Sequence, residues 1–282
     1  MRILLLTVLV MIAFAANTLL TRFAINGGLI DPAALALVRV ASGAAVLCAL
    51  FWLRGGRFAG FGRGGLAGTA ALAVYIIGHA LANLTIDAGI GALILFGVVQ
   101  ITMFGYGAAV GESPTMRQIM GAAVAFGGLM LVLWPDGQMQ LYIAGAALMI
   151  MAGIGWAAYT INGQGAADPL RNTARNFLFC VPVVACLLLV QDAQMTVQGV
   201  ALGVLCGGVT SGLGYALWYA VLPSLRSSTA AVAQLSVPVI ALLAGAALLA
   251  EPLGLRVGIA TVLVIGGIAL AITARSPQAD RS

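Results

Sequence analysis

Three polar or aromatic side chains recur every four residues within one apolar stretch of the sequence. If this stretch is helical, Tyr75, His79 and Asn83 share one face, because residues i and i+4 stand one above the other on a helix. The face offers a ring for stacking, an amide for hydrogen bonding and an imidazole, which ordinarily titrates near neutral pH. We predict that it forms a wall of a polar, partly aromatic cavity. The alternative is that His79 is structural and hydrogen-bonds to a neighbouring helix.

Other polar and aromatic side chains also lie far from the ends of apolar stretches. An unpaired amide or hydroxyl costs several kcal/mol to bury in an apolar medium, so such groups usually face partners or a cavity. A proline in a spanning helix also leaves one carbonyl without its usual donor. Some of the aromatic residues would alternatively fit an interfacial belt. We add nine residues to the predicted substrate cavity: Asn17, Gln100, Trp156, Tyr159, Tyr215, Trp218, Gln234, Ser236 and Pro238.

Three charged residues are expected to serve structure or gating. Arg39 lies midway along an apolar stretch, where a lone charge costs at least about 2.5 kcal/mol on insertion scales. It therefore needs an acceptor, which is either a structural group such as a helix carbonyl or the carboxylate of a substrate. Glu112 and Glu251 each follow an apolar stretch and lie close to a proline, so we place them at span ends.

Several kinds of chemistry lack the residues they require. All thirteen basic residues other than the one His are arginines, so a phosphate-binding loop with its lysine is excluded. One His, no CxxC motif and four cysteines inside apolar stretches predict free thiols and no metal site or cofactor. No apolar stretch carries a central Asp or Glu, so tight proton coupling is not expected. The absence of a nucleophile–base pair predicts that the chain is not an enzyme.

The composition places these residues in a membrane protein. Hydrophobic residues make up 62% of the 282 residues, charged residues make up 7%, and the mean hydropathy is +1.10. A soluble domain has about a quarter of its residues charged, and a spanning helix needs about 20 apolar residues. We predict an all-α integral membrane protein with ten transmembrane helices, near residues 3–25, 32–53, 66–86, 88–110, 117–134, 141–162, 170–190, 198–222, 228–249 and 253–273.

The distribution of arginine predicts the orientation. Arginine is enriched on the cytoplasmic side of membrane proteins. If both termini are cytoplasmic, the connections on the opposite side hold Arg256 alone. The cytoplasmic segments then hold Arg2, Arg54, Arg57, Arg63, Arg117, Arg171, Arg175, Arg226, Arg275 and Arg281.

The sequence also repeats itself. Residues 89–133 and 228–272 align without a gap, so that Glu112 matches Glu251 and Gly127-Gly128 matches Gly266-Gly267. Because each half holds an odd number of spans, the second half must be inverted in the membrane. We predict two inverted five-helix repeats at residues 1–137 and 138–275, followed by a disordered cytoplasmic tail at residues 276–282. Inverted repeats are common in secondary transporters, whose substrate site lies near the bilayer midplane.

A family resemblance rests on these repeats. Each half ends in Glu near Pro, a turn and a helix with Gly-Gly, which resembles the EamA domains of the drug/metabolite transporter superfamily. The stretch Ser236-Val237-Pro238-Val239, followed by Glu251-Pro252, is the most typical; the first half departs from it, with Val99-Gln100 in place of the expected proline. Within the superfamily the chain is most similar to bacterial aromatic-amino-acid exporters. The resemblance implies a bacterial inner (plasma) membrane location, with both termini cytoplasmic.

We therefore predict a secondary carrier that exports small neutral or zwitterionic metabolites by alternating access. Amino acids with aromatic or other apolar side chains are the expected substrates. The expected partners are this small molecule and the lipid bilayer, without nucleic acid, and the oligomeric state stays open, with a monomer compatible. The alternatives are export of drugs or other metabolites and flipping of a small lipid. A channel or an intramembrane enzyme is disfavoured.

Overall fold

The computed structural model describes residues 2–56, 63–86, 88–112, 114–134, 142–189, 193–249 and 255–273. Within these residues, ten helical segments are long and apolar enough to cross a membrane, and no strand longer than an isolated bridge between Ile30 and Met195 is found. The predicted all-α membrane fold is therefore confirmed. Glu251 and the predicted tail at residues 276–282 lie outside the described residues.

The spans follow the predicted windows to within a few residues. The first six are α1 (Arg2–Asn26), α2 (Pro32–Leu53), α3 (Arg63–Ala82), α4 (Ala88–Ala109), α5 (Met116–Leu133) and α6 (Ile143–Gln164). The seventh is α7 (Pro169–Ala185) with a 3-10 turn, Cys186–Leu189, and the last is α12 (Leu255–Ile272). The eighth joins α8 (Val197–Leu205), a π-helical segment (Cys206–Leu213), α9 (Gly214–Val221) and a 3-10 turn, Leu222–Ser224. The ninth joins α10 (Ser227–Gln234) and α11 (Ser236–Leu249).

Local side chains fix several helix ends. Thr115 precedes α5 and forms a capping box, in which its Oγ1 accepts from the Gln118 backbone N–H (3.2 Å) while Gln118 Oε1 accepts from the Thr115 N–H (2.9 Å). Asp168 caps α7 by accepting from the Arg171 N–H at 3.1 Å, with Pro169 at the first helical position. These ends set the lengths of α5 and α7 before any tertiary packing is considered.

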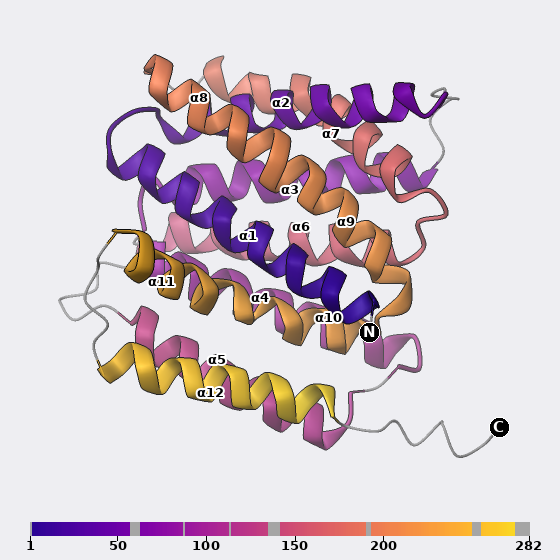
Figure 1. Cartoon of the computed structure of the whole chain (residues 1–282), viewed down its shortest axis with the longest axis vertical. Coiled ribbons are helices and arrows are strands. Elements are labelled where there is room, and N and C mark those ends of the chain that lie inside the picture. Colours follow the sequence, from indigo (N-terminus) through magenta and orange to yellow (C-terminus); the bar gives the residue numbers. More distant parts are fainter. Residues whose placement is uncertain are drawn as a thin grey trace.

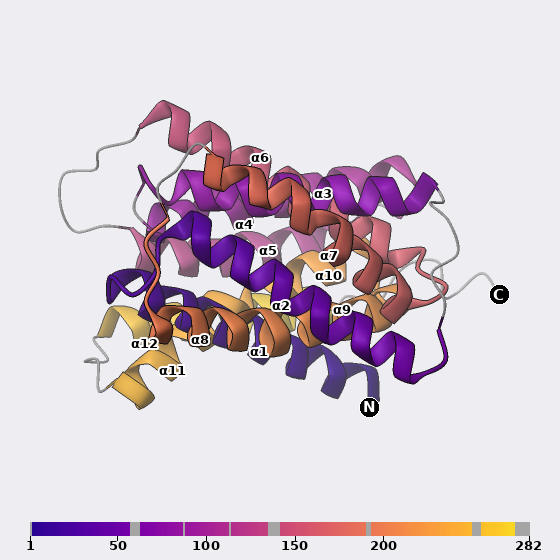
Figure 2. The same cartoon turned by 90° about the horizontal axis from the view of Figure 1, so that it is seen from above.

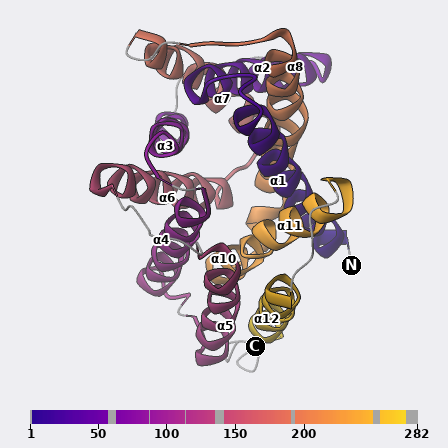
Figure 3. The ribbon, with the colours of Figure 1, turned by 90° about the vertical axis from the view of Figure 1, so that its left-hand side faces the viewer.

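The helices run along one direction and pack into a single bundle (Figures 1 and 2). The view from one end of the bundle places α5 and α12 together at one edge and α2, α7 and α8 at the other (Figure 3). The start of α1 and the last turn of α12 lie at the same end, on the right in Figure 1. An even number of spans requires this arrangement. We call this the N-terminal end of the bundle.

The contacts between spans keep the same pattern when span n is exchanged with span n+5. The pairing of α3 with α6 has its counterpart in the pairing of α1 with the eighth span, and that of α4 with α6 in that of α1 with α11. The pairs α2–α7, α5–α12 and α4–α10 map onto themselves. This pattern is compatible with the two inverted repeats predicted at residues 1–137 and 138–275.

Small residues allow α5 and α12 to approach closely. A Cβ added at Gly121 would lie 2.5 Å from the Gly267 carbonyl oxygen, and one added at Gly128 would lie 3.0 Å from the Ala260 carbonyl oxygen. The alignment of the repeats relates these two contacts to each other, because it matches Gly121 with Ala260 and Gly128 with Gly267. Close backbone approach of this kind supplies van der Waals contact between helices in lipid.

Candidate substrate cavity

A cavity of about 720 Å³ occupies one half of the bundle. Its lining comes from the second halves of α1, α3 and α5, from the first halves of α2, α4 and α12, and from α6 as far as Trp156. The eighth and ninth spans add Tyr215, Gln234 and part of α11. All these segments lie toward the end opposite the N-terminal end, which is the left-hand end in Figure 1. Pockets for small molecules typically have volumes of about 300–1,000 Å³, so this one is large enough for a metabolite.

The half of the bundle at the N-terminal end is packed. Large side chains fill it: Phe177, Trp218, Tyr219 and Leu222 are each at most 1% exposed. At the opposite end, by contrast, Trp134 both lines the cavity and is 46% exposed. The cavity is therefore accessible from one end of the bundle and closed toward the other.

Four aromatic rings form the floor of the cavity at mid-depth. The centre of the Trp156 ring lies 4.9 Å from that of Tyr75 and 5.0 Å from that of Tyr215, and Phe14 meets Tyr215 edge-on at 5.4 Å. Aromatic pairs at such separations contribute about 0.5–1.5 kcal/mol beyond the area they bury. Because the rings come from α1, α3, α6 and α9, the floor joins elements of both halves of the chain.

Gln234 fixes the orientation of Trp156. The Trp156 indole Nε1–H donates to Gln234 Oε1, and Gln234 Nε2 donates to the Ala230 carbonyl at 3.1 Å. The amide is 1% exposed, so both of its ends are satisfied inside the protein. Pro238 has no N–H for the Gln234 carbonyl four residues earlier, and the helix breaks between α10 and α11 at this point. Both Gln234 and Pro238 line the cavity.

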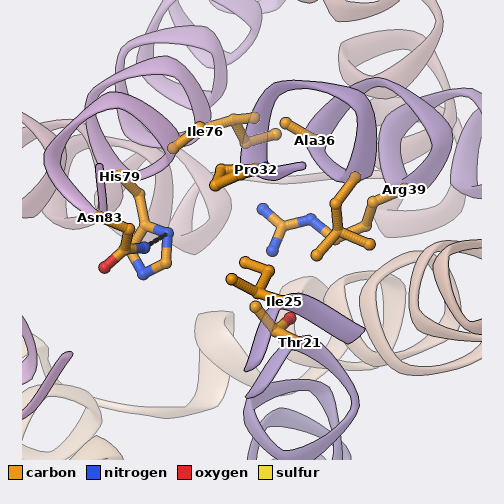
Figure 4. Close-up of a pocket in the computed structure, with 10 residues that line it drawn as sticks. Thr21, Ile25, Pro32, Ala36, Arg39, Ile76, His79 and Asn83 are labelled. Carbon is orange, nitrogen blue, oxygen red and sulfur yellow. Dashed lines mark hydrogen bonds between the residues drawn. The ribbon is translucent and has the colours of Figure 1, made fainter. Parts of the chain in front are cut away.

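Figure 4 shows a cluster of polar side chains, with Arg39 from α2 and His79 and Asn83 from the end of α3. Asn83 Nδ2 is 3.1 Å from His79 Nδ1, and because an amide nitrogen can only donate, Nδ1 accepts and the imidazole proton sits on Nε2. Next to this pair, a recess of about 20 Å³ lies between His79, Asn83 and the Arg39 side chain. A space of this size holds one water-sized group.

Arg39 is the charged member of this group. Its side chain is 6% exposed, and its guanidinium carbon lies 6.0 Å from the centre of the Tyr75 ring. The titratable groups of the described residues that interact with it are Tyr75, His79, Cys180, Cys206 and Tyr215, none of which is a carboxylate. A π-system stabilises a cation at such a distance but does not neutralise it.

The π-helical segment of the eighth span anchors α1. Asn17 Nδ2 lies 2.6 Å from Ser211 Oγ and 2.9 Å from Thr210 Oγ1, and it also contacts the Cys206 carbonyl at 3.4 Å. The widened turn of a π-helix presents these groups on one side, and such segments occur frequently at functional sites. Asn17 thus lines the cavity while its amide nitrogen holds two spans together.

Comparison with known proteins identifies the family. Residues 143–273 match the EamA-like transporter family, and the chain is 45% identical, over 99% of its length, to an uncharacterized protein of Pseudomonas aeruginosa, of which 98% is covered. This chain belongs to the EamA-like transporter family. It is also 27% identical over 74% of its length to an uncharacterized transporter of Archaeoglobus fulgidus, of which 76% is covered. A crystal structure at 19% identity shares the fold, with a TM-score of 0.77 over 94% of this chain and 98% of the other.

Membership in this family makes the chain a multi-pass membrane transporter of small solutes and favours a transporter over an enzyme. Eight of the residues predicted from the sequence line the cavity of this EamA-like transporter: Asn17, Tyr75, His79, Asn83, Trp156, Tyr215, Gln234 and Pro238. Arg39, which was predicted as an anchor or a carboxylate site, lines it too. Glu112 lies at the opposite end, after the last turn of α4.

Four other predicted residues do not line this cavity. Trp218 Nε1 donates to Thr160 Oγ1 at 3.4 Å, and Tyr159 is fully buried behind the floor. Gln100 is buried in the packed half. Ser236 Oγ donates to the Ala233 carbonyl at 2.7 Å, across the break between α10 and α11.

The structure adds lining residues that the sequence analysis did not select. Thr21 follows Asn17 by four residues, so the same helical spacing that selected the α3 face would have found it. Trp134 lies at the cavity mouth, where its carbonyl accepts from Arg256 Nη2 at 2.7 Å. Arg22 also lines the cavity.

Proposed function

We propose that this EamA-like transporter is a secondary carrier that exports small zwitterionic metabolites, in particular amino acids with aromatic or other apolar side chains, by alternating access. The observation that carries the proposal is the one-sided cavity, which ends at mid-depth on an aromatic floor. A site near the middle of the membrane that is open to one side is what a carrier between two half-cycles requires.

The chemistry of the lining supports this substrate class. The rings of Trp156 and Tyr215 offer flat apolar surface to an aromatic or branched side chain. His79 and Asn83 provide polar groups one and two helical turns beyond Tyr75, whose ring contacts Trp156. Ligand sites of this kind combine a mostly apolar wall with a few placed polar groups that fix orientation. A wholly apolar solute would leave the polar groups without partners.

Buried polar atoms in the packed half support the second access state. Gln100 Nε2 and Oε1 and Ser228 Oγ have no hydrogen-bond partner among the described residues. Buried polar groups are nearly always paired, and each unpaired one destabilises the closed packing. Opening of this half toward the N-terminal end would hydrate them, so the cost of opening is partly offset.

The arginine distribution predicts the side of the membrane to which the cavity opens. With both termini in the cytoplasm of a bacterium, the cavity faces outward across the inner membrane, and the packed half closes the cytoplasmic side. An exporter would release its substrate from this conformation.

Uptake into liposomes that contain the purified protein tests the substrate class. We expect labelled phenylalanine, tryptophan and leucine to enter faster than in empty vesicles, and lysine to remain at the background rate. Rates equal to empty vesicles for all four amino acids would refute this substrate class.

A further inference from the structure

The charges on the described part of the cavity wall all have one sign. Among the described residues that line it, Arg22, Arg39 and Arg256 carry positive charge, and neither Asp nor Glu is present. Arg256 donates to two backbone carbonyls, those of Leu131 and Trp134, at the mouth. The charge that lies deepest, beside the aromatic floor, is that of Arg39.

The Arg39 guanidinium faces open space rather than a protein anion. Figure 4 shows it pointing from α2 toward His79 and Asn83 on α3 and Thr21 on α1, with the recess of about 20 Å³ between them. The Tyr75 side chain hydrogen-bonds with Arg39, but no ion pair of Arg39, and no hydrogen bond from its side chain to a carbonyl, is found in the described part of the chain. A guanidinium that is 6% exposed in such a setting lacks the counter-charge that buried cations normally have.

The polar groups around the recess fit a carboxylate. A guanidinium presents N–H donors in a planar fork that matches the two oxygens of a carboxylate. With its proton on Nε2, His79 carries a further donor, and the recess accommodates one water-sized group such as a carboxylate oxygen. The Tyr75 ring, which contacts both Arg39 and Trp156, connects this polar recess to the aromatic floor.

We propose that Arg39 binds the carboxylate of the substrate, and that the cavity selects for this carboxylate and not for an ammonium group. The inference rests on the proposed function and narrows its substrate class to aromatic or apolar carboxylates, of which amino acids are one kind. The described wall offers no anion to pair with an ammonium group. A deaminated analogue should therefore bind about as well as the amino acid.

Three ligands with the same aromatic skeleton distinguish binding through the carboxylate from binding through the ammonium group. Phenylalanine carries both, 3-phenylpropionate keeps the carboxylate, and phenethylamine keeps the ammonium group. Each is tested as a competitor of labelled phenylalanine uptake into liposomes that contain the full chain, and by the thermal shift it causes in the purified protein. We expect 3-phenylpropionate to compete within about threefold of phenylalanine and phenethylamine to be weaker by about tenfold or more, as loss of a charge-assisted contact implies.

Two substitutions at one position and a matched control assign the selectivity to Arg39. Arg39→Gln should abolish the preference for 3-phenylpropionate over phenethylamine, and Arg39→Lys should keep part of it, because a lysine retains the charge but not the fork. Arg117→Gln removes an exposed arginine outside the cavity and should leave the preference unchanged. The ratio of the two analogues is measured on one preparation, so it does not depend on how much of a variant folds.

The outcomes separate this inference from the proposed function. If phenylalanine is taken up but phenethylamine competes as well as 3-phenylpropionate, the role of Arg39 is overturned. The same holds if the Arg39→Gln variant keeps the wild-type preference. Neither result contradicts the proposed carrier function. The absence of phenylalanine uptake, together with no thermal shift from any of the three ligands, overturns both.

Discussion

Replacement of Gly207 by alanine tests whether the π-helical segment positions Arg39. A Cβ at Gly207 would overlap the Ser42 hydroxyl and the Arg39 carbonyl oxygen, and it would lie 2.7 Å from the Arg39 carbonyl carbon. Ordinary van der Waals contact begins near 3.4 Å, and two of the three obstacles are backbone atoms that cannot rotate away. The eighth span and α2 must therefore separate, and the Arg39 side chain moves with α2.

Two opposing effects determine how far Gly207→Ala lowers the free energy of unfolding. Overpacking costs about 1–3 kcal/mol, and the gain from replacing a helical glycine by alanine returns up to about 1 kcal/mol. The expected net loss of about 1–2 kcal/mol lowers the thermal midpoint by a few degrees for a chain of this size. If displacement of Arg39 costs the substrate a hydrogen bond to a charged group, about 1.5–3 kcal/mol, KM rises by about 10- to 100-fold.

The neighbouring glycine provides the control. A Cβ at Gly208 would meet only Val46 Cγ2, at 3.1 Å, so this one methyl group must shift by a few tenths of an ångström. Gly208→Ala should therefore keep the wild-type midpoint and KM within about twofold, because no backbone atom has to move. Both variants are compared by thermal unfolding in detergent and by concentration-dependent uptake in liposomes. A Gly207→Ala protein with the wild-type midpoint and KM would refute the packing argument.

Three further changes test other parts of the structure. Gly267→Ala should lower the thermal midpoint, because its Cβ would lie 2.6 Å from a backbone nitrogen of α5, whereas Gly266→Ala meets nothing within 4 Å and should not lower it; equal midpoints would show that α5 and α12 do not pack through this glycine. His79→Ala removes a polar group of the recess and should slow phenylalanine uptake by about tenfold with an unchanged midpoint, and an unchanged rate would remove His79 from the site. In a variant without native cysteines, Trp134→Cys at the cavity mouth should react with a membrane-impermeant thiol reagent on intact cells, and Arg117→Cys at the other end of α5 should react only after lysis; the reverse pattern would contradict the orientation.

The parts of the structure that depend on local sequence were predictable. Span positions followed from runs of about 20 apolar residues. The face of Tyr75, His79 and Asn83 lines the cavity as predicted, because a four-residue spacing fixes a face whatever the helix packs against. Their role in binding stays a prediction.

The remaining features depend on how helices pack against one another. Tyr159 and Trp218 are aromatic residues within spans, yet they lie behind the floor, since the rotation of α6 and α9 is set by their neighbours. The π-helical turn at Cys206–Leu213 has no signature that separates it from an α-helix in the sequence. The recess beside Arg39 likewise forms only when α1, α2 and α3 meet.

Counterflow tests the central claim, that this chain is a carrier with a single site exposed alternately to the two sides. Liposomes that contain the protein are loaded with unlabelled phenylalanine and diluted into a trace of labelled phenylalanine. A carrier predicts that the label rises transiently above its equilibrium level and then falls, because the exchange of inner for outer substrate is faster than net efflux. Label that rises to equilibrium without an overshoot, or that enters no faster than in empty vesicles, would contradict the account.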